Sequence, residues 1–122
     1  MRVLYVEDDA MNRKVMRAML SSSGATMSEA VDGQAGVDAV ERDEFDLVLM
    51  DLRMPGMDGL TAIKHIRQRG DAKARLPIIV VTADTAPNMR EDCLRIGADD
   101  VVYKPVAVKL LFSAIGQVLS RR

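Results

Sequence analysis

A short apolar segment that ends at an aspartate constrains this chain more than any other feature. The segment Leu47–Met50 is apolar at every position and is followed at once by Asp51. Strands that are apolar on both faces are typical of parallel sheets covered by helices on both sides. We therefore predict that Leu47–Met50 is a central strand. Asp51 then lies at its carboxyl end, where open parallel sheets bind their ligands.

The rest of the chain repeats this alternation of a short apolar run and a helical pattern. Four further apolar runs predict strands, at residues 3–6, 26–31, 78–81 and 101–103. Five segments with apolar residues at helical spacing follow the strands, at residues 11–20, from 33 onward, 59–69, 87–96 and 108–119. Strands that alternate with helices predict an α/β fold built on a doubly wound parallel sheet. With 122 residues the chain has the length of one domain, residues 1–122.

Capping and turn residues mark the ends of several predicted helices. Asp58 is placed to cap a helix that begins near Gly59. Pro87 suits the first turn of the helix that closes on Gly97. Residues 70–75 are predicted to form a polar loop. The apolar stripe of the first helix is predicted at Met11, Val15, Ala18 and Met19.

Composition argues against several classes of function. A formal net charge of −1 argues against a strong nucleic-acid or membrane-binding surface. No apolar run approaches the ~20 residues of a membrane-spanning helix, and Met1-Arg2 leads directly into a predicted strand, so we expect no signal peptide. The single cysteine, Cys93, excludes an internal disulfide and a thiolate metal cluster. We therefore expect a cytoplasmic domain that binds neither nucleic acid nor membrane.

Polar residues also follow the other predicted strands. Glu7-Asp8-Asp9 follows residues 3–6, and Thr82 and Lys104 follow the last two strands. If the first strand lies beside Leu47–Met50, these groups converge on one crevice, where adjacent carboxylates repel and raise one another's pKa. A hard cation such as Mg²⁺ relieves that repulsion, and a lysine and a hydroxyl suit an added phosphoryl group. The chemistry indicated is an aspartate nucleophile that accepts a phosphoryl group. Taken singly, the acidic residues also fit an ordinary strand end and solvated loop charges.

Four motifs follow one another along the chain: Val6-Glu7-Asp8-Asp9, residues 50–59, Val81-Thr82-Ala83 and Tyr103-Lys104-Pro105. In this order and spacing they resemble the receiver domain of two-component response regulators, over essentially the full length. Residues 88–100 look most like receivers attached to hybrid sensor kinases, so a free-standing domain and a part of a hybrid kinase both fit. The resemblance implies a flavodoxin-like sheet of five strands in the order 2-1-3-4-5, for which receivers are a standard example.

The resemblance implies a role for each residue of the acidic crevice. Asp51 matches the aspartate that is phosphorylated by a histidine kinase or a histidine phosphotransfer protein. Asp8 matches a direct Mg²⁺ ligand, so Mg²⁺ is expected to bind through Asp8 and Asp51. Glu7 matches an acidic neighbour that acts through water, and Arg53 matches the residue that lends a backbone carbonyl to the metal. Asp9 matches no fixed role.

The resemblance also implies how the domain signals. Thr82 matches the hydroxyl that moves onto the phosphoryl group, and Lys104 matches the lysine that pairs with it. The Lys104-Pro105 bond matches one that is usually cis. The implied protein is a signalling phosphoacceptor rather than an enzyme acting on a metabolite. Its fourth helix, fifth strand and fifth helix would change on phosphorylation and bind a partner or a second copy.

One position departs from the family, which usually has tyrosine or phenylalanine three residues before the lysine. Here that residue is Val101, and the only aromatic residue of the strand is Tyr103 on the same side. Two routes for switching remain, through Tyr103 or through residues 83–86 and the helix that follows. We favour the loop, because we expect Tyr103 to be packed and held. Arg53 and Asp84 are expected to pair at the mouth of the site and tune the phosphoryl group's lifetime.

Other readings of the same residues fit less well. A degenerate receiver without phosphorylation would not need the Asp8, Asp51, Thr82 and Lys104 set. A phosphohydrolase with an aspartate nucleophile would have a second carboxylate at the position of Arg53. A flavin-binding domain of this topology needs a phosphate-binding loop after the first strand, where the acidic residues would repel phosphate. We interpret His65 as a surface residue and Cys93 as a packing residue.

Overall fold

The computed structural model describes residues 1–121 and contains one five-stranded parallel sheet. The strands are β1 (Arg2–Val6), β2 (Thr26–Ala30), β3 (Leu47–Met50), β4 (Ile78–Thr82) and β5 (Asp100–Tyr103). The helices are α1 (Ala10–Ser21), α2 (Gly33–Arg42), α3 (Gly59–Arg67), α4 (Met89–Ile96) and α5 (Val108–Ser120), with a 3₁₀ turn, η1 (Ala72–Arg75). The strand order is β2-β1-β3-β4-β5, so the predicted fold class and order are confirmed.

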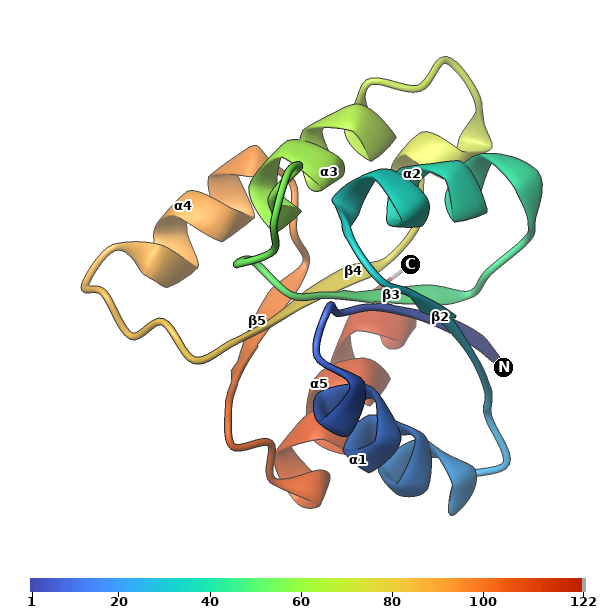
Figure 1. The fold of residues 1–122 in the computed structure, drawn as a ribbon, viewed down its shortest axis with the longest axis vertical. Coiled ribbons are helices and arrows are strands. Elements are labelled where there is room, and N and C mark those ends of the chain that lie inside the picture. The colour runs from blue at the N-terminus through green and yellow to red at the C-terminus, as the bar shows by residue number, and fades with distance from the viewer. Residues whose placement is uncertain (122) are drawn as a thin grey trace.

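Helices cover both faces of the sheet and bury its middle strands. Helices α1 and α5 lie on one face, and α2, α3 and α4 lie on the other (Figure 1). Each face carries its own apolar cluster, one around Val48 and Ile63 and the other around Leu49 and Leu111. All side chains of Leu47–Met50 are fully buried, as predicted for a central strand. No helix within residues 1–121 is long and apolar enough to cross a bilayer.

The predicted apolar stripe of α1 was wrong. The helix buries Met16 and Leu20, whereas Met11, Val15 and Ala18 are exposed and Met19 is only half-buried. Polar contacts with residues outside the helix hold it in this orientation. Three side chains make these contacts: Asn12 donates to Glu7, Arg13 to the Glu7 carbonyl and to Glu29, and Arg17 to the Met27 carbonyl and to Glu29. These contacts turn an apolar face outward, which the local pattern of α1 could not reveal.

Smaller differences concern where elements begin and end. Asp58 caps α3 as predicted, because its carboxylate accepts from the Thr61 N–H at 2.9 Å. Pro87 lies in the turn before α4 and not in its first turn, since the Met89 N–H donates to the carbonyl of Ala86. The predicted polar loop at 70–75 contains η1, which is capped by the Asp71 carboxylate. The Lys104-Pro105 bond is cis, as expected.

The beginning of α3 lies directly against the backbone that carries Asp51. A Cβ placed on Gly59 would lie 2.1 Å from the carbonyl oxygen of Asp51, which is far inside van der Waals contact. Only glycine allows this approach, so Gly59 fixes how α3 is seated beside the end of β3.

Replacing Gly59 by alanine is therefore expected to lower the free energy of unfolding by about 1–3 kcal/mol, because backbone must shift. Gly116→Ala is the matched control, since Gly116 is an exposed position inside α5 with open space around its Cα. That substitution should stabilise the domain by about 0.5–1 kcal/mol. Urea unfolding of both variants checks the pair, and equal effects at the two glycines would contradict the packing described.

Candidate functional site

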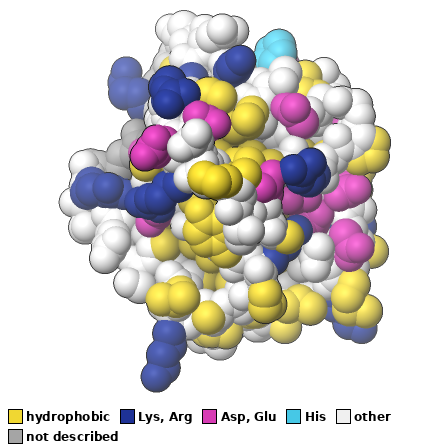
Figure 2. Space-filling model, turned by 90° about the vertical axis from the view of Figure 1, so that its left-hand side faces the viewer, with side chains coloured by type: hydrophobic (Ala, Val, Ile, Leu, Met, Phe, Trp, Pro, Cys, Tyr) yellow, Lys and Arg dark blue, Asp and Glu magenta, His cyan; other side chains and the backbone are white. Residues whose placement is uncertain are grey.

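The predicted site residues come together at the carboxyl edge of the sheet. Carboxylate oxygens of Glu7, Asp8 and Asp51 lie within 4.8 Å of one another. The ammonium of Lys104 lies 2.6 Å from Glu7 Oε1 and 3.5 Å from Asp51 Oδ1. The register of the sheet produces this convergence, because the Asp51 N–H donates to the Val6 carbonyl and extends the pairing of β1 with β3. Figure 2 looks onto this edge and shows acidic side chains beside hydrophobic ones.

Thr82 enters the site from β4 next to the lysine. Its side chain is buried at the end of the strand, and its carbonyl accepts from the Lys104 N–H at 2.8 Å. The Thr82 hydroxyl accepts a hydrogen bond from the Asp84 N–H at 3.0 Å. The hydroxyl is therefore tied to the loop that follows β4.

Glu7, rather than Asp51, is the principal partner of Lys104. Glu7 is only 1% exposed, and its Oε1 also accepts from the Tyr5 hydroxyl at 3.1 Å and from the Asn12 amide at 3.2 Å. Sequence reasoning missed both donors. A signal existed for Tyr5, which is the only aromatic residue of its strand and lies two positions before Glu7, on the same side.

Burial and the nearby charges shift the protonation of the cluster. Burial and the neighbouring Glu7 raise the pKa of Asp51 to about 6, although Lys104 opposes the change. Burial alone would raise the pKa of Glu7 as well, but hydrogen bonds from Lys104 and the Asp51 carboxyl lower it to about 2. Burial opposes the charge on Lys104, yet Glu7 and Asp51 raise its pKa, so the lysine stays a cation. Burial and Glu7 also raise the pKa of Asp8.

The donor set fits a hard divalent cation. Three carboxylates with oxygens this close offer the ligands that Mg²⁺ prefers. Within residues 1–121 the only histidine, His65, is exposed on α3, and the only cysteine, Cys93, is buried against Met89, so neither enters the cluster. Soft or nitrogen-based coordination is therefore not what this site offers. The chemistry available is phosphoryl transfer to a buried aspartate beside a lysine.

Three further residues surround the cluster. Asp9, which had no assigned role, caps α1 by accepting from the Asn12 N–H at 2.9 Å. Arg53 and Asp84 form the expected ion pair, which links the loop after β3 to the loop after β4. The Asp84 carboxylate also accepts from the Ala86 N–H, and these two hydrogen bonds lower the pKa of Asp84.

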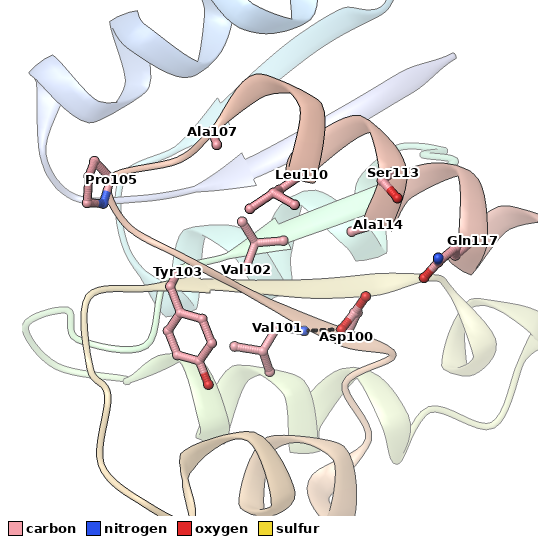
Figure 3. A pocket seen from close by; sticks show the side chains of 10 residues that line it. All are labelled: Asp100, Val101, Val102, Tyr103, Pro105, Ala107, Leu110, Ser113, Ala114 and Gln117. Carbon is pink, nitrogen blue, oxygen red and sulfur yellow. Dashed lines mark hydrogen bonds between the residues drawn. The ribbon is translucent and has the colours of Figure 1, made fainter.

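The structure corrects the expectation for Tyr103. Val101 and Tyr103 point to the same side of β5, and Val101 is buried (Figure 3). The Tyr103 side chain is not packed and held, because the residue is 40% exposed at the end of an edge strand. Packing therefore gives no reason to prefer the loop as the route of switching. The hydrogen bond from Asp84 to the Thr82 hydroxyl does give one.

Comparisons with known proteins agree with this geometry. The sequence model of the response regulator receiver domain matches residues 3–116. The sensor protein GacS of Pseudomonas syringae pv. syringae is 37% identical over 116 residues, which are 93% of this chain and 13% of GacS. The response regulator MprA of Mycobacterium leprae is 38% identical over 121 residues, which are 99% of this chain and 52% of MprA. The chain thus spans about half of MprA and a much smaller share of GacS.

A solved structure is similar along almost the whole chain. The receiver domain of the sensor histidine kinase PA1611 from Pseudomonas aeruginosa PAO1 superposes with a TM-score of 0.88 at 35% identity. The match covers 98% of this chain and 97% of that domain. A magnesium ion is coordinated in the active site cleft of the PA1611 domain.

The raised pKa of Asp51 predicts that its ionised carboxylate destabilises the metal-free protein, by an amount that depends on pH. The folded value of about 6 exceeds the ordinary 3.8. The unfolded chain therefore loses this proton first, and stability falls as the pH rises from about 4 to 6. Asp51→Asn removes the buried charge and should therefore raise the free energy of unfolding of the metal-free domain at pH 7 by about 1–3 kcal/mol. The gain should shrink at pH 4.

Urea unfolding with EDTA at the two pH values measures this difference. Asp38→Asn serves as the control, because Asp38 is an exposed aspartate on α2, outside the cluster. A parent protein as stable at pH 7 as the Asp51→Asn variant would contradict the prediction.

Proposed function

The chain belongs to the response regulator receiver domain family, and from this premise we propose that it accepts a phosphoryl group on Asp51. The observation that carries the proposal is the buried Asp51 carboxylate, held next to Lys104 and among the oxygens of Glu7 and Asp8. The donor is a phosphohistidine on a histidine kinase or a histidine phosphotransfer protein. The domain carries out its own phosphorylation and slow dephosphorylation, and it turns over no external metabolite.

In this proposal the acidic residues hold a Mg²⁺ ion. Asp8 and Asp51 are its direct ligands together with the backbone carbonyl of Arg53, and Glu7 acts through a water molecule. When bound, the ion offsets the negative charge of the carboxylates and of the incoming phosphoryl oxygens. The proximity of the three carboxylates supports this assignment.

The transfer itself is a displacement at phosphorus. An oxygen of Asp51 forms a bond to phosphorus as the bond from phosphorus to the donor's imidazole nitrogen breaks, and the electron pair of that bond stays on the imidazole. Lys104 then pairs with a phosphoryl oxygen, for which its ammonium moves from Glu7 toward Asp51. The Thr82 hydroxyl moves to another phosphoryl oxygen.

The donor is inferred to dock at the outward apolar face of α1, formed by Met11, Val15 and Ala18. This face adjoins a hollow of about 310 Å³ that also reaches Lys104. The lining residues of the hollow are Tyr5, Asn12, Val15, Met16, Met19, Lys104, Pro105 and Val106. A helix seated here would bring its phosphohistidine to the mouth of the site. We place this exchange in the cytoplasm, a reducing compartment that suits a domain with one unpaired cysteine.

Switching is proposed to run through the loop after β4. Movement of the Thr82 hydroxyl would break its hydrogen bond from Asp84, and Asp84 in turn holds Arg53 and the Ala86 N–H. The surface formed by α4, β5 and α5 would then change through a shift between existing populations. The groove between β5 and α5 in Figure 3, where Leu110 is 67% exposed, would bind a partner or a second copy.

Acetyl phosphate and Mg²⁺ test the proposed function directly. Intact-mass spectrometry should show one added phosphoryl group on the parent and none on Asp51→Asn, because no second acceptor is proposed. Lys104→Ala should lose the change in amide chemical shifts that beryllofluoride, a phosphoryl mimic, causes in the parent. A parent that takes up no phosphoryl group would favour a degenerate receiver that binds partners unphosphorylated. A full mass increase in Asp51→Asn would refute the assignment of the acceptor.

The ion pair between Arg53 and Asp84 is predicted to lengthen the lifetime of the phosphoryl group by hindering water. Replacing both residues by alanine should speed dephosphorylation several-fold. The contribution of the ion pair to stability should be small, about 0–1 kcal/mol, because the Arg53 side chain lies largely in solvent. The matched control is Arg42→Ala with Asp43→Ala, an ion pair at the end of α2 whose side chains are both largely exposed and lie away from the cluster. The measurement is the half-life of the phosphorylated protein. An unchanged or longer half-life in the Arg53→Ala, Asp84→Ala variant would count against a role of this ion pair in hindering water.

A further inference from the structure

Two neutral donors hold Glu7 from outside the acidic cluster. The Tyr5 hydroxyl and the Asn12 side-chain amide both donate to Oε1, the same oxygen that Lys104 contacts at 2.6 Å. The other oxygen, Oε2, accepts from the Asp9 N–H at 3.3 Å. Tyr5 and Asn12 contact neither Asp8 nor Asp51 by hydrogen bond within residues 1–121.

Both donors are fixed in place before any ligand arrives. Tyr5 is 1% exposed on β1, and its ring packs in the apolar cluster between the sheet, α1 and α5. Burial and the charge of Glu7 raise the pKa of Tyr5, so its hydroxyl remains a donor. Asn12 lies in the first turn of α1, where its backbone N–H donates to the carboxylate of the capping residue Asp9. A phenylalanine would fill the same volume as Tyr5, so packing alone does not explain the hydroxyl.

When Lys104 leaves Glu7 for the phosphoryl group, the Glu7 carboxylate needs other hydrogen-bond donors. Glu7 is almost fully buried, and its shortest contact is with Lys104. When Lys104 moves to a phosphoryl group, the Glu7 carboxylate loses that partner while it stays buried. A buried charge without partners is strongly unfavourable, whereas hydrogen bonds from neutral donors offset part of this cost.

We propose that Tyr5 and Asn12 are positioning residues that hold the Glu7 carboxylate when Lys104 leaves it for the phosphoryl group on Asp51. The inference rests on the proposed function. The two residues act through Glu7, so they affect the step in which Lys104 changes partner. Their effect on the binding of Mg²⁺ is small, because in the proposed site Glu7 meets the ion only through water and Lys104 stays beside Glu7.

Separate titrations with Mg²⁺ alone and with beryllofluoride in saturating Mg²⁺ test this division. Both are followed by amide chemical shifts in the full chain. Tyr5→Phe and Asn12→Ala should each bind Mg²⁺ within about twofold of the parent, but bind beryllofluoride about tenfold more weakly, the effect of one hydrogen bond to a charged group. Asp8→Asn should weaken Mg²⁺ binding at least tenfold, which shows that the first titration detects a lost ligand. Thermal unfolding without Mg²⁺ verifies that each variant is folded.

A second background isolates the role of the charge. In Glu7→Gln the side chain keeps its size but carries no charge, so adding Tyr5→Phe should weaken beryllofluoride binding by less than about twofold. Equal losses of Mg²⁺ and beryllofluoride affinity in Tyr5→Phe and Asn12→Ala would overturn the inference, as would a tenfold loss in the Glu7→Gln background. If the variants match a parent that binds beryllofluoride, the inference alone fails. A parent that binds none refutes the proposed function and the inference together.

Discussion

The contact between Lys104 and the carboxylates of Glu7 and Asp51 is the interaction on which the rest of the structure depends. Lys104 directly follows the last strand and Glu7 directly follows the first, and the two residues are 97 positions apart in the chain. The ammonium can reach both carboxylates only if β1, β3 and β5 end at the same edge of one parallel sheet. Three features bring these strand ends together. They are the strand order, the backbone hydrogen bond from the Asp51 N–H to the Val6 carbonyl, and the close packing of α3 at Gly59 against the end of β3.

The sequence predicted those parts of the molecule whose cause is local. Leu47–Met50 is apolar on both faces and is the buried central strand, and Asp58 is the helix cap that its spacing indicated. The face of α1 could not be predicted in the same way. Its apolar positions suggest one stripe, but Asn12, Arg13 and Arg17 bind carboxylates and carbonyls on the sheet and turn the helix. Periodicity within a helix carries no information about polar partners that lie outside the helix.

The site shows the same division between local and distant causes. Asp8, Asp51 and Lys104 follow directly from the ends of strands, so their convergence could be foreseen. The preference of Lys104 for Glu7 over Asp51 could not, because it depends on where Tyr5 and Asn12 place the Glu7 carboxylate. The exposure of Tyr103 was also missed, since an edge strand leaves its last side chain without a covering neighbour. Side-chain hydrogen bonds and edge effects are properties of the assembled sheet.

The hydrogen bond to the Thr82 hydroxyl comes from the main chain of Asp84 and not from a side chain. Every amino acid except proline supplies the same donor at that position. A link of this kind survives most substitutions, whereas a link through an aromatic ring is lost with a single change. A switching route through this main-chain link, as proposed above, would not require an aromatic ring at position 101, where this chain has Val101. Substitutions on the outer surface of α4, β5 and α5 would then leave the link beneath them unbroken.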